Sequence, residues 1–128
     1  IINYAKIARD MTEFMETISA LEESEEKYRT TSRLYRLMAD NIPDLIWAKD
    51  LKSKFIFVNK AVCEKLLDAR NTDEPIGKDY MFFANRQRAQ RPEQKDWFTF
   101  GELCINSDEV TLKAKKTMHF DEFGNVHG

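Results

Sequence analysis

A heptad repeat over residues 11–42 constrains the fold of this chain more than any other feature. One row of the repeat consists of Met11, Ile18, Glu25, Ser32 and Ala39, and the other of Phe14, Leu21, Tyr28, Tyr35 and Ile42. Alternating steps of four and three residues are the period of a coiled coil. We therefore expect residues 11–40 to form a long amphipathic helix that pairs in parallel with a second copy. A helix packed on its own domain is the alternative. Pairing is expected because an unpaired helix of this length with an exposed apolar stripe would be marginally stable in water.

The ends of this helix carry their own signals. Asp10 is a typical N-cap residue, and Glu13 stands three positions later, as in a capping box. At the other end, Pro43 disfavours helical geometry at Ile42. We expect a helix start at Asp10, an end before Pro43, and docking of the last turns on a globular body through a second apolar stripe: Leu34, Leu37 and Met38.

A short β-hairpin is predicted directly after the helix. Residues 45–48 and 54–58 are strand-like, and the polar segment 50–53, which begins with Asp50, forms a tight turn between them. Asn59 follows as the expected N-cap of a short amphipathic helix.

Further along the chain the pattern is less regular. That amphipathic helix is expected over residues 60–67, followed by a loop over residues 68–79. Ser107 is expected to cap a helix that runs to Ala114. Residues 117–126 are expected to form a strand.

Composition excludes several classes of protein. Hydrophobic residues make up 42% and charged residues 33%, so the chain can build a core, and its net charge of −2 gives no strong field for nucleic acid. Cys63 and Cys104 lack any CxxC spacing and are expected to be reduced, mostly buried thiols in a cytoplasmic protein with no metal site; a disulfide or a metal site is the alternative. No apolar run approaches the roughly 18 residues of a membrane span, so we expect no membrane insertion in what we interpret as a fragment.

Residues 41–67, NIPDLIWAKDLKSKFIFVNKAVCEKLL, resemble the opening of the PAS family. Ile76-Gly77-Lys78 is similar to the IGK loop found further on in that family. The resemblance implies an α+β fold in which residues 41–128 form a sensor domain. Its antiparallel sheet, flanked by short helices, would have five strands in the family and is expected to be incomplete here.

The front of the chain carries a second resemblance. Ala8 to Glu13 (ARDMTE), with Asp10 and Thr12, looks like the signature that closes a PAS domain, and residues 20–29 resemble a connector between two such domains. This implies that residues 1–10 are the tail strand of a preceding PAS-like unit, and residues 11–40 a signalling helix. From the residues alone, segment 1–9 could be strand or helix.

The resemblance implies a sensory module rather than an enzyme. Such a module binds a small ligand or a partner in its cleft and relays its state through a dimeric coiled coil. The relay would reach an effector in the same polypeptide, of the histidine kinase or diguanylate cyclase type, as in two-component systems. The module would be cytoplasmic, alone or within a membrane-anchored receptor. A dimerisation or scaffolding module without ligand is the alternative.

The resemblance also suggests where a ligand would lie. Cleft candidates, with ordinary core packing as the alternative, are Ile46, Ala48, Phe57, Val62, Leu66 and Trp97. The cofactor is unknown. Flavin is disfavoured because neither cysteine has the family's reactive context, and haem because His119 and His127 lie at or beyond the third strand. Asp50 and Asn59 are expected to have structural roles.

Overall fold

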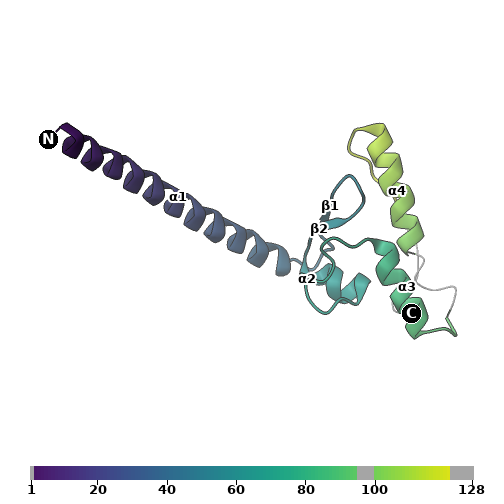
Figure 1. The fold of residues 1–128 in the computed structure, drawn as a ribbon. Helices are drawn as coiled ribbons and strands as arrows, with labels where there is room; N and C mark the ends of the chain where they lie inside the picture. Colours follow the sequence, from purple (N-terminus) through teal and green to yellow (C-terminus); the bar gives the residue numbers. More distant parts are fainter. Residues whose placement is uncertain (1, 95–99, 122–128) are drawn as a thin grey trace. The chain divides into compact units, whose positions relative to one another are not determined.

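The chain forms two compact units, one ending at Met38 and the other beginning at Ala39 (Figure 1). The computed structural model describes residues 2–94 and 100–121. The elements in order are α1 (Ile2–Asp40), β1 (Trp47–Lys49), β2 (Phe55–Val58), α2 (Lys60–Val62), the π-helical turn η1 (Cys63–Leu67), α3 (Tyr80–Gln90) and α4 (Phe100–Ala114). This order confirms the predicted α+β class with a long helix in front.

Helix α1 extends over 39 residues, which confirms the long helix predicted for residues 11–40. It begins at Ile2 and not at Asp10, so the N-cap at Asp10 is wrong, and residues 2–10 are helical where a tail strand was expected. A helix satisfies its backbone hydrogen bonds within one segment, whereas a strand needs a partner edge. From Arg9 to Asp40, every side chain of α1 is exposed or at most half-buried.

Strands β1 and β2 form the predicted antiparallel hairpin. Their register pairs Trp47 with Val58, Ala48 with Phe57, and Lys49 with Phe55, with an irregularity between Ala48 and Lys49. Such a bulge bends the strand and redirects its side chains. Strand β1 begins two residues later than the predicted start at residue 45.

Asp50 organises the turn of this hairpin, as predicted. Its Oδ1 accepts hydrogen bonds from the backbone N–H groups of Lys52 and Lys54, both at 2.9 Å. Ser53 takes a left-handed backbone conformation, with φ of 61°. The Asp50 carboxylate therefore supplies the acceptor for two backbone N–H groups of this tight turn.

The loop over residues 68–79 covers part of the outer edge of β2. The Gly77 N–H donates to the Phe55 carbonyl at 2.8 Å, and the Phe55 N–H donates to the Lys78 carbonyl at 2.8 Å. Gly77 has φ of +81°, a conformation that side-chain-bearing residues rarely adopt. The segment Ile76-Gly77-Lys78 thus serves as a short edge to the hairpin.

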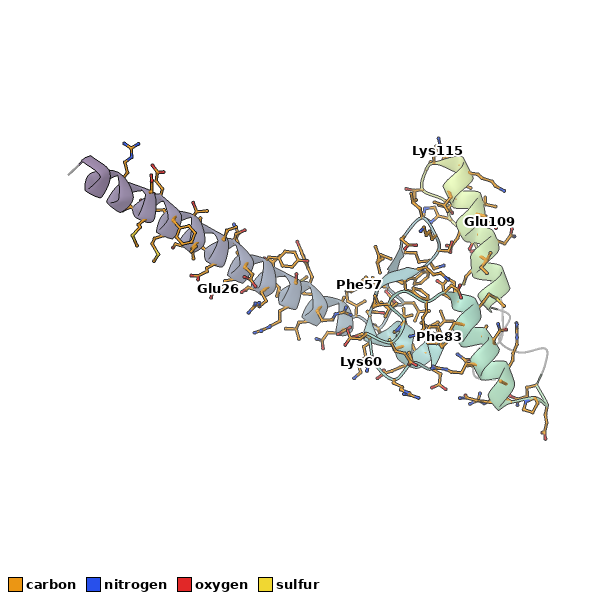
Figure 2. The ribbon with its side chains drawn as sticks, viewed as in Figure 1. Glu26, Phe57, Lys60, Phe83, Glu109 and Lys115 are labelled. Carbon is orange, nitrogen blue, oxygen red and sulfur yellow. The ribbon has the colours of Figure 1, made fainter. Side chains whose placement is uncertain are left out.

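The core of the second unit lies between the hairpin, the short helices and α3. Phe83 on α3 is fully buried in it (Figure 2). Tyr80 meets Phe55 edge to face, with ring centroids 4.9 Å apart. The buried cluster consists of Phe55, Val58, Val62, Cys63, Leu66, Leu67, Tyr80, Phe83, Ala84 and Cys104.

Two predictions about the last third of the chain are wrong. Ser107 does not cap a helix: α4 begins at Phe100, and the Ser107 hydroxyl donates to the Cys104 carbonyl at 3.1 Å from within it. A serine bonded in this way is tolerated inside a helix. Residues 117–121 are not in a strand, and residues 122–126 lie outside the described residues. In the described part of the chain the sheet has two strands, which agrees with the predicted incomplete sheet.

Candidate functional site

A cavity of about 230 Å³ is the first candidate for a functional site. Trp47 of β1, Tyr80 of α3 and four residues of α4 contribute to its wall, together with the segment that follows α4. The lining residues are Trp47, Tyr80, Cys104, Ser107, Asp108, Thr111, Met118 and Phe120. Aromatic rings, two sulfur atoms and one carboxylate therefore surround it. The polar groups of Ser107, Asp108 and Thr111 share the wall with these apolar side chains, and the volume is small for a ligand site.

An ion pair links Lys49, which lines a second cavity, to Asp108, which lines both cavities. Lys49 Nζ contacts Asp108 Oδ2 and lies 3.7 Å from the centroid of the Tyr80 ring. The Lys49 side chain is only 9% exposed, and that of Asp108 27%. Asp108 and Thr111 also line the second cavity, of about 190 Å³, with Lys49, Asp50, Ser53 and Leu112. A largely buried ion pair loses much of its Coulomb gain to desolvation, so its value lies more in position than in stability.

Asn59 forms a hydrogen-bonded junction at the end of α1. Its side chain is fully buried. The amide Nδ2 donates to the carbonyls of Ala39 and Asp44, both at 2.9 Å, and more weakly to Ile42 at 3.4 Å. Oδ1 accepts from the N–H groups of Ile46 at 3.1 Å and Val62 at 3.2 Å. One side chain therefore ties the last turn of α1 to the approach to β1 and to the start of α2.

Two further contacts reinforce this junction. The Lys60 N–H donates to Asp40 Oδ1 at 2.8 Å, and Lys65 Nζ donates to the Pro43 carbonyl at 2.6 Å. The N-cap role of Asn59 was predicted and is confirmed. Its bonds to Ala39 and Asp44 were missed. An amide at an N-cap, in place of Ser or Asp, was the available signal, since only an amide carries a donor as well as an acceptor.

Two carboxylates outside the cavities anchor the loop before α3. Hydrogen bonding by the Arg70 N–H, at 2.6 Å, and by the Arg86 guanidinium, at 2.5 Å, holds the pKa of Glu74 below its usual value. The Lys54 ammonium, 2.7 Å away, and the Phe82 N–H likewise lower the pKa of Asp79. Both groups are charged at neutral pH and act as structural anchors.

The predicted cleft residues do not line either cavity. Ile46 and Phe57 are half-buried, and Ala48 is exposed. Val62 and Leu66 pack in the core cluster. Trp97 lies outside the described residues. Trp47, which lies between the predicted residues Ile46 and Ala48, lines the larger cavity instead. The sequence could not predict this, because the alternation of side chains along a strand does not show which face turns inward.

The apolar seam on α1 is present and exposed. Met11 is 62% exposed, Phe14 64%, Leu21 65%, Tyr28 75% and Tyr35 66%, and Ile18 is half-buried. The second stripe is exposed as well, at 53% for Leu34, 60% for Leu37 and 57% for Met38. Single apolar side chains on a surface are ordinary, so their recurrence at the heptad positions of one helix is the informative observation.

The remaining candidates for chemistry are placed as follows. Both cysteines are buried and form no disulfide, and Cys104 lines the larger cavity. His119 is exposed after α4, and His127 lies outside the described residues. Within residues 2–94 and 100–121, His, Cys, Asp and Glu side chains form no group of three able to hold a metal ion. Among the same residues no helix combines the length and apolar character needed to cross a bilayer.

Comparison with known proteins identifies the family. The model of the PAS domain family matches residues 33–101, which is more than half of the 128 residues. No curated protein and no solved structure matches the chain. The matched segment contains the hairpin, the Asn59 junction, α3 and the last turns of α1. The chain belongs to the PAS domain family.

Proposed function

We propose that this chain is a sensory input module that passes the state of its second unit to α1 through the Asn59 junction. PAS domains are in general sensory or signalling modules, and the family membership supports this class of function. Binding, rather than catalysis, is the proposed role of its cavities. The effector would be a domain of the histidine kinase or diguanylate cyclase type.

The Asn59 junction is the observation that carries the proposal. A signal that starts in the hairpin has to reach α1 through contacts, since coupling between sites travels through a physical network. Asn59 receives the Ile46 N–H, one residue before β1, and holds the Ala39 carbonyl at the end of α1. A shift of the hairpin therefore changes the hydrogen bonding of the last turn of α1.

The exposed seam on α1 supports a homodimer as the form that transmits the signal. Phe14 and Leu21 supply an apolar half to the seam, whereas Glu25 and Ser32 interrupt it further on. Polar residues at core positions of a coiled coil cost stability. A weakly paired middle of the coiled coil leaves two arrangements of the paired helices close in energy. A small change in the second unit can then shift the equilibrium between these two arrangements.

A dimerisation or scaffolding module without ligand is the second candidate. The burial of Val62 and Leu66 in the core cluster favours it, since these two predicted cleft residues contribute to the core. Native mass spectrometry and thermal shift against a panel of metabolites separate the two candidates. A retained ligand supports the sensor, and a panel without any shift supports the scaffold.

Two-probe unfolding tests the proposed coupling directly. Circular dichroism at 222 nm follows α1, which holds most of the helix, and tryptophan fluorescence follows the segment after α1, because Trp47 and Trp97 both belong to it. Coincident transitions indicate one cooperative unit. For the unmodified chain we expect the two melting curves to coincide.

The variant Asn59→Asp keeps the acceptor and removes the donor. Its Oδ1 can still receive Ile46 and Val62, but an oxygen replaces the amide that faces the Ala39 carbonyl. We expect the two transitions to separate in this variant and to stay together in the control Asn85→Asp, on the exposed side of α3. Transitions that coincide in all three chains, or that are already separate in the unmodified one, contradict the proposed relay.

A further inference from the structure

The larger cavity has the electrostatic character of a cation site. Trp47, Tyr80 and Phe120 bring three aromatic rings to it, and Asp108 brings a carboxylate. The first two rings meet edge to face, with centroids 6.2 Å apart. The face of an aromatic ring is negative, so rings and a carboxylate together attract an ammonium group.

The hydroxyl groups at this cavity add to the same character. The Ser107 hydroxyl donates to the Cys104 carbonyl at 3.1 Å, and the Thr111 hydroxyl donates to the Ser107 carbonyl at 2.8 Å. A hydroxyl has one hydrogen to donate and two lone pairs to accept with. With its hydrogen used inside α4, the Thr111 oxygen offers an acceptor to a ligand. A cation with N–H or polarised C–H groups matches this acceptor.

A cation of the protein itself already uses these groups. The Lys49 ammonium lies 3.7 Å from the centroid of the Tyr80 ring and pairs with Asp108. Both partners also line the cavity. Lys49 itself lines the second cavity, and its ammonium group uses Tyr80 and Asp108, the two groups that a cation in the larger cavity would contact.

We propose that the cavity binds a small organic cation, which displaces Lys49 from Asp108 and from the face of Tyr80. This inference rests on the proposed sensory function and names the class of its ligand. The space of about 230 Å³ is at the lower end of ligand sites, so the ligand is a small molecule. The displaced ammonium turns into the second cavity, which Lys49 already lines beside the carboxylate of Asp50.

The exchange has a direct route to the junction. Lys49 ends β1 and Asp108 lies on α4, so the ion pair joins the hairpin to that helix. Its release frees β1, and the Ile46 N–H that precedes β1 is bonded to Asn59. A cation in the cavity thus acts on the same side chain that holds the end of α1.

Titration of the 128-residue chain with choline, followed by calorimetry and by tryptophan fluorescence, tests the proposal. The neutral alcohol 3,3-dimethyl-1-butanol has the same shape as choline without its charge and serves as the ligand control. We expect saturable binding of choline and none of the alcohol. Removing the internal competitor in Lys49→Met should tighten choline binding about tenfold.

Two acidic positions on α4 give a matched pair of variants. Asp108→Asn removes the carboxylate of the cavity and should abolish choline binding. Glu109→Gln removes the same charge at the next residue, which is exposed on α4 (Figure 2), and should leave binding unchanged. Loss of binding in both variants would indicate a general charge effect and would overturn the assignment of Asp108.

The inference is overturned if choline binds the unmodified chain and Lys49→Met no better than the neutral alcohol does. Where Lys49→Met does not fold, as judged by circular dichroism, the comparison of the two ligands on the unmodified chain decides alone. The two-probe unfolding of Asn59→Asp uses no ligand. If choline does not bind but the two transitions of Asn59→Asp separate, the ligand class is rejected and the relay stands. If choline binds but the two transitions of Asn59→Asp coincide, the relay alone is rejected.

Discussion

Replacement of Asn59 by alanine gives the sharpest prediction about stability. The substitution removes a fully buried amide that makes four hydrogen bonds of 3.2 Å or less, to Ala39, Asp44, Ile46 and Val62. Each such bond contributes about 1 kcal/mol net, and its loss leaves a buried backbone group without its partner. The four together amount to about 4 kcal/mol. Water that enters the vacated space recovers part of this, so we expect a loss of about 3 kcal/mol.

Urea denaturation followed by tryptophan fluorescence measures this loss. With a slope of about 2 kcal/mol per molar urea, a loss of about 3 kcal/mol lowers the unfolding midpoint by about 1.5 M. Asn85→Ala is the matched control, because Asn85 is exposed on α3 and surface substitutions change the free energy of unfolding by about 0.5 kcal/mol or less. Equal midpoints for Asn59→Ala and Asn85→Ala would refute the role given to the junction.

Two further predictions concern the loop before α3 and the packing of α4. The lowered pKa of Glu74 means that its charged form stabilises the fold above its ordinary pKa of 4.5, and that this contribution is lost as pH falls through the folded pKa. Glu74→Gln should therefore lower stability at pH 7 and flatten the decline below pH 4.5, measured by urea midpoints against pH; an unchanged acid decline would contradict this. Gly101→Ala should destabilise by about 1 kcal/mol, because the added Cβ would lie 3.1 Å from the Ala84 Cβ and 2.8 Å from the Met81 sulfur; a thermal midpoint equal to or above that of the unmodified chain would show that α3 and α4 have room to separate.

Local patterns predicted the first half of the second unit well. The Asp50 turn, the paired strands and the Asn59 cap each depend on residues within a few positions of one another. Such short-range features can be predicted from the types of neighbouring residues in the sequence. The long helix was equally visible, because the heptad period is a property of sequence alone.

The position of the cavities depends on long-range contacts, which local sequence patterns do not predict. Lys49 and Asp108 are far apart in the chain, and only the fold brings their charges together beside Tyr80. The sequence placed the cleft on Val62 and Leu66, apolar residues that the fold uses for its core. Burial alone does not distinguish a core position from a cavity wall, since both require apolar side chains.

Errors at the two ends of the chain have a common cause. The helical start at Ile2 and the irregular course of residues 117–121 both replace predicted strands, the first implied by the family resemblance and the second by the residue pattern. A strand forms only where a neighbouring edge accepts its backbone hydrogen bonds. Among the described residues the sheet consists of β1 and β2 alone, and neither segment pairs with it.

Sedimentation equilibrium of the 128-residue chain tests the central claim, that α1 signals as a paired helix. We predict a concentration-dependent dimer that the double variant Phe14→Glu, Leu21→Glu converts to a monomer, because both residues are exposed apolar members of the seam. Ala20→Glu adds charge at an exposed position outside the seam and should leave the dimer intact. A chain that remains monomeric at the highest attainable concentration, or a dimer that survives both seam charges, would contradict the account.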